Sequence, residues 1–211
     1  MRTLLNPADK PAHDAFVEKK SEFIGDACHV DSLEDALAFV ETVRERHPKA
    51  RHVAYAAIVT GDDGRVMERM SDDGEPSGTA GKPILDVLRA NELTDCVIAV
   101  TRYFGGILLG SGGLIRAYST GASIAVKAAD VVQIVVCARY TVPLDYSQLG
   151  PMRHLVEVMG AVEESAVFSD HVVLTVLVRD DARESFEHRV REQFSATVTP
   201  EYVGRCHRAM R

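Results

Sequence analysis

Nine of the fifteen glycines of the chain lie between residues 71 and 121, in two blocks whose pattern is typical of anion binding. The first block, SDDGEPSGTAGKPILDVL, covers residues 71–88, and the second, TRYFGGILLGSGGLIRAYSTGA, covers residues 101–122. Each block places a glycine-rich turn directly before an amphipathic helix. Because a helix start has unpaired N–H groups and the positive end of the helix dipole, it attracts phosphates and carboxylates. The sequence therefore predicts a surface that receives an anionic group.

Three basic side chains and one aromatic side chain in these blocks are candidates for direct contact with a phosphate-bearing ligand. We expect Lys82, Arg102 and Arg116 to contact phosphates and Tyr103 to stack on a base or a ligand ring. Phe104 is expected to fill the core instead. Small residues in the second block would let a ligand backbone approach closely. These further candidates are Gly105, Gly106, Gly110, Ser111, Gly112 and Gly113.

The first block also contains a polar loop that could be an accessory part of the site. Its carboxylates could reach one hard cation together with His47 or His52. The alternative is turn chemistry, in which the Asp side chains cap their own backbone and the Glu side chain is solvated. The turn interpretation is favoured, so we expect no metal and no cofactor. The loop residues are Asp72, Asp73, Glu75, Ser77 and Thr79.

Two nucleotide-binding motifs resemble these blocks without matching them. The segment that ends in Gly81-Lys82 departs twice from the phosphate-binding loop G-x-x-x-x-G-K-[ST], because Pro76 and Pro83 occupy the first glycine and the hydroxyl position. The second block is similar to the glycine-serine loop of small-molecule kinases, which holds ATP phosphates. This similarity leaves open an enzyme that acts on a phosphorylated small molecule. No catalytic residue is predicted, and Cys96 is expected to lie in the core.

The periodicity of apolar residues predicts the elements that position these blocks, and the pattern restarts near residue 138. In the first part we expect strands at residues 21–30, 52–60, 65–70, 96–101 and 131–136, a turn at 61–64, and helices at 33–47, 82–91 and 114–129. In the second part we expect strands at 140–144, 163–168, 171–179 and 197–203, with helices at 146–159 and 181–194. The second order is β-α-β-β-α-β, typical of a ferredoxin-like domain. The sequence thus predicts an α+β protein with domains at 1–137 and 138–211.

Composition excludes some classes of protein. The net charge is −7, and the two expected domains carry −5 and −2, so nucleic acid could bind only at a local basic patch. No apolar run has the roughly 20 residues of a membrane span. The N-terminus lacks an apolar signal core, and the four cysteines are scattered without a C-x-x-C pair, which is typical of reduced thiols. We therefore expect a cytoplasmic protein with no membrane partner.

The two glycine-rich blocks together resemble the signature of the IMPACT family in its bacterial YigZ-type branch. The similarity includes SDDGEPSGTAGKPIL and VTRYFGGILLGSGGLIRAYS, and it extends upstream to KSEFI at residues 20–24 and HVAYA at residues 52–56. The resemblance implies a first domain similar to the second domain of small-subunit ribosomal protein five. It also implies a second domain similar to the last domain of elongation factor G.

The resemblance implies an association with translation and supplies no catalytic residues. The main hypothesis is a two-domain binding protein that contacts RNA or the ribosome through the glycine-rich cleft, with a protein partner as a further expectation. The first alternative is an enzyme on a phosphorylated small molecule or nucleotide. The second is a protein-interaction adaptor in which the glycine-rich loops serve folding alone.

Overall fold

The computed structural model describes residues 1–61 and 64–210, which form an α+β protein with two compact units, 1–133 and 134–210. The expected boundary after residue 137 falls inside strand β7 (Val131–Leu144), which continues from the first unit into the second. The prediction of separate strands at 131–136 and 140–144 is therefore wrong. No glycine or proline interrupts residues 131–142, so the strand does not break there.

The first unit contains a five-stranded antiparallel sheet that carries the glycine-rich blocks. From edge to edge its strands are β2 (Ala12–Glu18), β3 (Ser21–His29), β6 (Cys96–Tyr103), β4 (His52–Thr60) and β5 (Val66–Ser71). The predicted strand 52–60 is confirmed, and the predicted hairpin partner is β5. The turn expected at 61–64 includes residues 62 and 63, which lie outside the described residues.

Two N-terminal strands were not predicted. Strand β1 (Arg2–Leu4) has three residues and pairs with the first residues of β7, where Arg2 lies opposite Gln133. Strand β2 is an edge strand with mostly exposed side chains, so it lacks the strict apolar alternation of a half-buried strand. Both strands depend on pairing with distant residues, which a local sequence pattern does not record.

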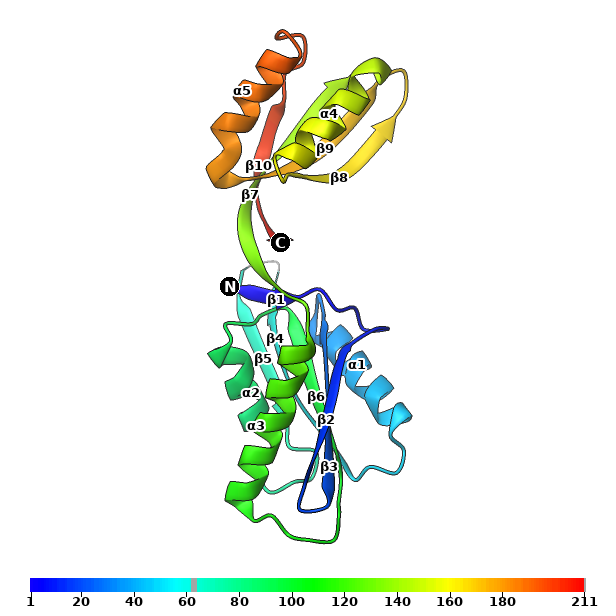
Figure 1. Cartoon of the computed structure of the whole chain (residues 1–211), viewed down its shortest axis with the longest axis vertical. Helices are drawn as coiled ribbons and strands as arrows, with labels where there is room; N and C mark the ends of the chain where they lie inside the picture. The colour runs from blue at the N-terminus through cyan, green and yellow to red at the C-terminus, as the bar shows by residue number, and fades with distance from the viewer. Residues whose placement is uncertain (62–63, 211) are drawn as a thin grey trace. The chain divides into compact units, whose positions relative to one another are not determined.

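The sheet is covered by helices on both faces (Figure 1). Helix α1 (Leu33–Arg46) lies on one face and begins at Ser32, whose side-chain oxygen accepts the N–H of Asp35. Helices α2 (Gly81–Ala90) and α3 (Ser111–Ala128) lie on the other face, and each follows a glycine-rich turn as expected. No helix in the described part of the chain is long and apolar enough to cross a membrane.

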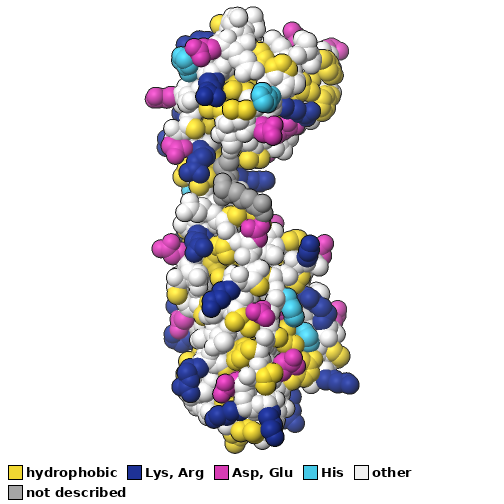
Figure 2. Space-filling model, viewed as in Figure 1, with side chains coloured by type: hydrophobic (Ala, Val, Ile, Leu, Met, Phe, Trp, Pro, Cys, Tyr) yellow, Lys and Arg dark blue, Asp and Glu magenta, His cyan; other side chains and the backbone are white. Residues whose placement is uncertain are grey.

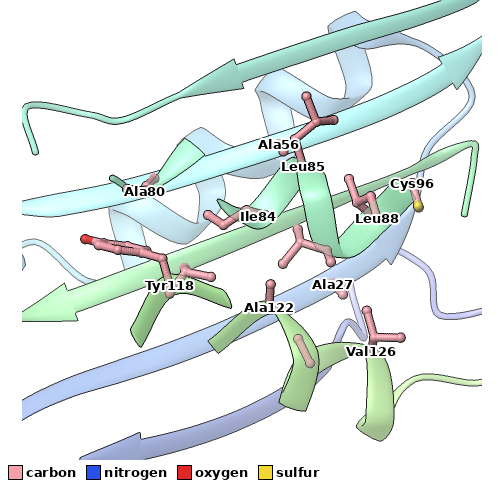
Figure 3. Packing of buried hydrophobic residues seen from close by; sticks show 14 of the residues in the cluster. Ala27, Ala56, Ala80, Ile84, Leu85, Leu88, Cys96, Tyr118, Ala122 and Val126 are labelled. Atoms are coloured by element: carbon pink, nitrogen blue, oxygen red, sulfur yellow. The ribbon is translucent and has the colours of Figure 1, made fainter. Parts of the chain in front are cut away.

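The core beneath α2 and α3 combines small residues on the sheet with larger ones on the helices (Figure 3). Ala27 and Ala56 on the strands are fully buried, and Ile84 and Leu88 of α2 fill the space above them. Cys96 is also fully buried, which confirms the prediction that it is a core residue. Close packing of this kind holds the two helices against the sheet.

The second unit has the predicted β-α-β-β-α-β order. Across its sheet, β10 pairs with β7, β7 pairs with β9, and β9 pairs with β8. The predicted last strand, 197–203, lies too early in the sequence. Residues 195 and 196 have positive φ and Thr197 bonds back to Phe194, so a turn occupies this stretch. The elements after β7 are α4 (Tyr146–Val158), β8 (Val162–Phe168), β9 (Val172–Arg179), α5 (Arg183–Gln193) and β10 (Glu201–Met210).

Candidate anion-binding site

The two glycine-rich blocks meet in a cavity of about 350 Å³ at the carboxyl end of β6. The acidic loop forms one wall, and the segment that leads into α3 forms the other. Polar and apolar side chains both line the cavity. The lining residues are Arg51, His52, Glu75, Pro76, Arg102, Phe104, Leu108, Leu109, Gly110, Ser111 and Leu114.

The start of α2 is occupied by the chain's own carboxylate. Oδ1 of Asp72 accepts the N–H groups of Ala80 and Gly81 at 2.9 and 2.8 Å, and Oδ2 accepts that of Gly78 at 2.8 Å. Burial opposes the charge on Asp72, but these three hydrogen bonds favour it, and its pKa falls below the ordinary value. An external anion at this helix start would compete with Asp72.

The neighbouring carboxylate, Asp73, is bound into the fold. It accepts two hydrogen bonds from Arg44, at 2.9 and 3.1 Å, and one from the N–H of Val53 at 2.6 Å. Burial opposes its ionised form, yet these bonds lower its pKa. His52 donates from Nδ1 to the Asp73 carbonyl at 2.7 Å, so this ring nitrogen is already used within the fold. Asp72 therefore shows the turn chemistry expected for the Asp residues of this loop, whereas the Asp73 side chain binds distant parts of the chain instead of its own backbone.

The remaining hydroxyl residues of this loop have different surroundings. Ser77 is exposed, whereas Thr79 is buried and donates to the Pro76 carbonyl at 2.6 Å. Among the described residues, no group of three or more His, Cys, Asp or Glu side chains could hold a metal ion.

The start of α3 has no capping side chain. Its N-cap is Gly110, which has a φ of 72° and offers no side-chain acceptor, and the first turn has no acidic residue. Ser111 and Gly112 are exposed there. Both Gly110 and Ser111 line the cavity, so the N–H groups of this helix start are available to a ligand.

Arg102 is buried against a carboxylate at the base of the cavity. Its Nη1 donates to Oε1 of Glu75 at 2.6 Å, and the hydroxyl of Tyr118 donates to the same oxygen at 2.8 Å. The expectation of a solvated Glu75 is wrong, since its side chain is 4% exposed and that of Arg102 is 7% exposed. Burial, and then the Glu75 carboxylate, raise the pKa of Tyr118. The Arg102 charge is therefore largely balanced inside the protein.

Tyr103 and Phe104 do not take the positions expected for them. Successive residues of a strand point to opposite faces, so Tyr103 lies on the α1 side, where His47 Nδ1 is 3.0 Å from its hydroxyl. Arg102 lies on the α2 and α3 side, so these two candidates are not brought together. Phe104 is 43% exposed rather than a core residue, and it lies at the cavity over the Arg102 guanidinium, 5.4 Å from ring centre to Cζ.

The basic candidates differ in how they are paired. Lys82 forms an ion pair with Asp86, with Nζ 2.6 Å from Oδ2, one turn further along α2. Arg116 is exposed and lines a second hollow of about 240 Å³, together with Lys19 and Gly113. Leu109 lines both hollows, so the two are neighbours across the loop before α3.

Sequence reasoning missed three cations at this end of the unit. Arg51 lines the first cavity, while Lys19 and Lys20 form the two-residue turn between β2 and β3 with φ of 45° and 65°. Such a turn favours Asn and Gly, so two lysines at its tip are an unusual choice. The available signal was the pair of lysines directly before a predicted strand.

The loop before α3 is fixed against this turn. The N–H of Gly105 donates to Ser21 Oγ at 3.1 Å, and a Cβ on Gly105 would lie 1.9 Å from the Lys20 carbonyl oxygen. Gly106 also has a positive φ, of 84°. The lysine turn, the loop and the α3 start therefore lie together at the lower end of this unit in Figure 1. Basic and hydrophobic side chains gather at this end in Figure 2.

The chain is similar to known proteins of one family, and the similar segments include this site. The family model described as the Impact N-terminal domain matches residues 19–126, and a domain of unknown function matches residues 142–197. A Haemophilus influenzae IMPACT family member is 37% identical over 180 residues, which cover 85% of this chain and 87% of that protein. The Escherichia coli IMPACT family member YigZ is 39% identical over 159 residues, covering 75% and 76% of the two chains.

A solved structure agrees with these sequence relatives. A crystal structure described as that of a hypothetical protein covers 96% of this chain and 96% of its own, with 31% identity and a TM-score of 0.62. The domain model alone matches more than half of the chain, and it includes both glycine-rich blocks. The chain belongs to the IMPACT family, and within it is similar to the bacterial YigZ-type members.

Proposed function

We propose that this protein is a translation-associated binding protein that contacts RNA through the loop end of its first unit. The observation that carries the proposal is the combination of an uncapped helix start at α3 with exposed cations around it. A helix start supplies N–H donors for a phosphate. The cations add a local attraction for a polyanion, which the net charge of −7 does not provide.

Four basic side chains form this surface, which we call the basic end: Lys19, Lys20, Arg51 and Arg116. In the described part of the chain none of the four forms an ion pair within 4.0 Å. Lys82 is paired with Asp86 and Arg102 with Glu75, so these two candidates have less charge to offer. We therefore propose that the basic end, which includes Arg116, contacts phosphates, and that Lys82 and Arg102 do not.

The link to translation rests on the family. We propose that the protein acts in the cytoplasm and that its partner is the ribosome or an RNA of the translation machinery. We also propose that the two units are separate domains with the two folds that the resemblance implies. Superposition of each unit by itself on the ribosomal protein five and elongation factor G domains tests that part.

A binding titration at several salt concentrations tests the proposal. The variant Lys19→Gln/Lys20→Gln/Arg116→Gln should bind ribosomes and structured RNA more weakly than the wild type. Each lost phosphate contact should reduce the log–log salt slope by about 0.7 on single strands and by about 0.9, the B-DNA value, on a duplex. Three contacts predict a total reduction of about 2–3.

A second variant controls for net charge. Lys10→Gln/Arg69→Gln/Lys127→Gln removes the same three charges from exposed positions outside the basic end. It should leave most of the affinity and most of the salt slope. If both triple variants behave alike, the basic end does not bind RNA, and the adaptor hypothesis becomes the better account. Magnesium-dependent turnover of a nucleotide would instead favour the enzyme.

A further inference from the structure

The cavity at the carboxyl end of β6 has chemical features that binding of an RNA backbone by the basic end does not use. Its volume of about 350 Å³ is within the range of small-molecule sites. Phosphate contacts alone need only an exposed groove. A hollow lined by apolar side chains and by a nearly buried ion pair is suited to a compact ligand.

Two nearly buried polar side chains at the base have unused hydrogen-bonding atoms. Arg102 Nε has no acceptor in the described part of the chain. Oε1 of Glu75 accepts two hydrogen bonds, whereas no described group donates to its other oxygen, Oε2. Buried polar atoms are ordinarily satisfied, so the unpaired Arg102 Nε indicates a partner that enters the cavity, whereas Oε2 is not buried and is open to a ligand as an acceptor. Together they offer one donor and one acceptor to the edge of a ligand.

The mouth of the cavity adds a flat surface and an anion site. The Phe104 ring is half-exposed and lies over the Arg102 guanidinium. Unpaired bases commonly stack on aromatic rings and on arginine planes. The α3 start at Gly110 and Ser111 lines the same cavity, as does Arg51, and a helix start suits a phosphate.

We propose that this cavity receives a single nucleotide unit, with the base stacked at Phe104, its edge bonded to Glu75 and Arg102, and its phosphate at the start of α3. The inference rests on the proposed function for its RNA source, because the unit is either a nucleotide splayed out of an RNA or a free mononucleotide. A base edge with adjacent donor and acceptor groups complements the carboxylate and guanidinium, and inorganic phosphate uses only part of the site.

Calorimetric titration of the full chain with AMP, GMP, CMP and UMP tests the inference, with inorganic phosphate and the four nucleosides as partial ligands. At least one mononucleotide should bind more tightly than both of its parts. Phe104→Ala should weaken that binding about 5- to 150-fold, the range for loss of a base stacked on an aromatic ring. Mononucleotides that bind no better than phosphate, or that are indifferent to Phe104→Ala, would overturn the inference.

Two further variants test whether Glu75 itself reads the base or only supports the fold. Glu75→Gln should change which mononucleotide binds best. Tyr118→Phe removes the hydrogen bond that the Tyr118 hydroxyl donates to Glu75 Oε1. Because Tyr118 does not line the cavity, this variant should keep the wild-type preference among mononucleotides. Identical preferences in wild type and Glu75→Gln would contradict base-edge reading. Phe104→Ala is at an exposed site, so it keeps the test valid if the buried variant does not fold.

A short single-stranded RNA distinguishes the two sources of the nucleotide. If RNA binding falls with Phe104→Ala and its salt slope stays the same, the cavity takes a base from RNA. If mononucleotide binding needs Phe104 but RNA does not bind, the cavity takes a free nucleotide and the proposed function fails. If RNA binding depends on the basic end alone and no mononucleotide binds, the proposed function stands and the nucleotide site is refuted.

Discussion

Replacing Asp72 tests why the two glycine-rich helix starts differ. In Asp72→Ala the N–H groups of Gly78, Ala80 and Gly81 lose their acceptor. Loss of a single N-cap side chain costs about 0.5–2 kcal/mol, and hydrogen bonds to a charged group are worth about 1.5–3 kcal/mol each when buried. Because the loop is only partly buried, water replaces some of these bonds. We expect a loss of about 2 kcal/mol in the free energy of unfolding.

This loss should be visible in thermal and urea denaturation. About 2 kcal/mol lowers the midpoint by roughly 4–8 °C in a chain of this size. Ser77→Ala changes an exposed side chain of the same loop and should leave the midpoint within about 1 °C, as is usual for neutral surface changes. A variant Asp72→Ala that is as stable as the wild type would show that Asp72 does not cap α2.

The same residue predicts a pH dependence with a defined sign. The folded-state pKa of Asp72 is lowered, so the folded protein favours the carboxylate more than the unfolded chain does. Its contribution is complete above the unfolded pKa of about 3.9 and is lost as the pH falls through the lower folded pKa. The stability difference between wild type and Asp72→Ala should therefore be constant near neutral pH and shrink below about pH 4. A difference that grows on acidification would refute the assignment.

Two further predictions concern the loop and the thiols. Gly105→Ala should destabilise the protein by about 3 kcal/mol, the upper end of ordinary overpacking, because its Cβ would meet the Lys20 carbonyl. A Cβ on Gly112 would make only an ordinary contact, 3.7 Å from Nη1 of the exposed Arg116, so Gly112→Ala should be neutral or stabilising in thermal denaturation. Cys206 is partly exposed and should react with iodoacetamide in the native protein, while burial raises the pKa of Cys28 to about 12 and should protect it until unfolding; equal labelling of the two, measured by mass spectrometry, would contradict this.

Local sequence signals predicted much of the fold because they are physical causes of it. The strand at 52–60 and the helix capped by Ser32 were predicted because β-branched runs and caps act within a few residues. Strands β1 and β2 were missed because they form by pairing with distant segments. The continuity of β7 was missed because two different neighbours pair with its two halves.

The candidate site was predicted as a region but not as a set of contacts. The sequence indicates that glycine-rich turns precede α2 and α3, yet it does not show that Asp72 fills one of these helix starts. It also does not show that Arg102 and Glu75 neutralise each other in the core. The first fact depends on how the loop at residues 72–81 folds back on itself, and the second on two side chains 27 residues apart in the sequence. Pairing of this kind decides which predicted cations remain available.

We infer that an external phosphate binds at the start of α3 and not at the start of α2. The most direct measurement follows backbone amide resonances by NMR during titration with phosphate-bearing RNA. We expect shifts at Gly110, Ser111, Gly112 and Gly113, whereas the amides of Gly78, Ala80 and Gly81 should stay unchanged because Asp72 already accepts their hydrogen bonds. Shifts confined to residues 78–81, or none at residues 110–113, would contradict it.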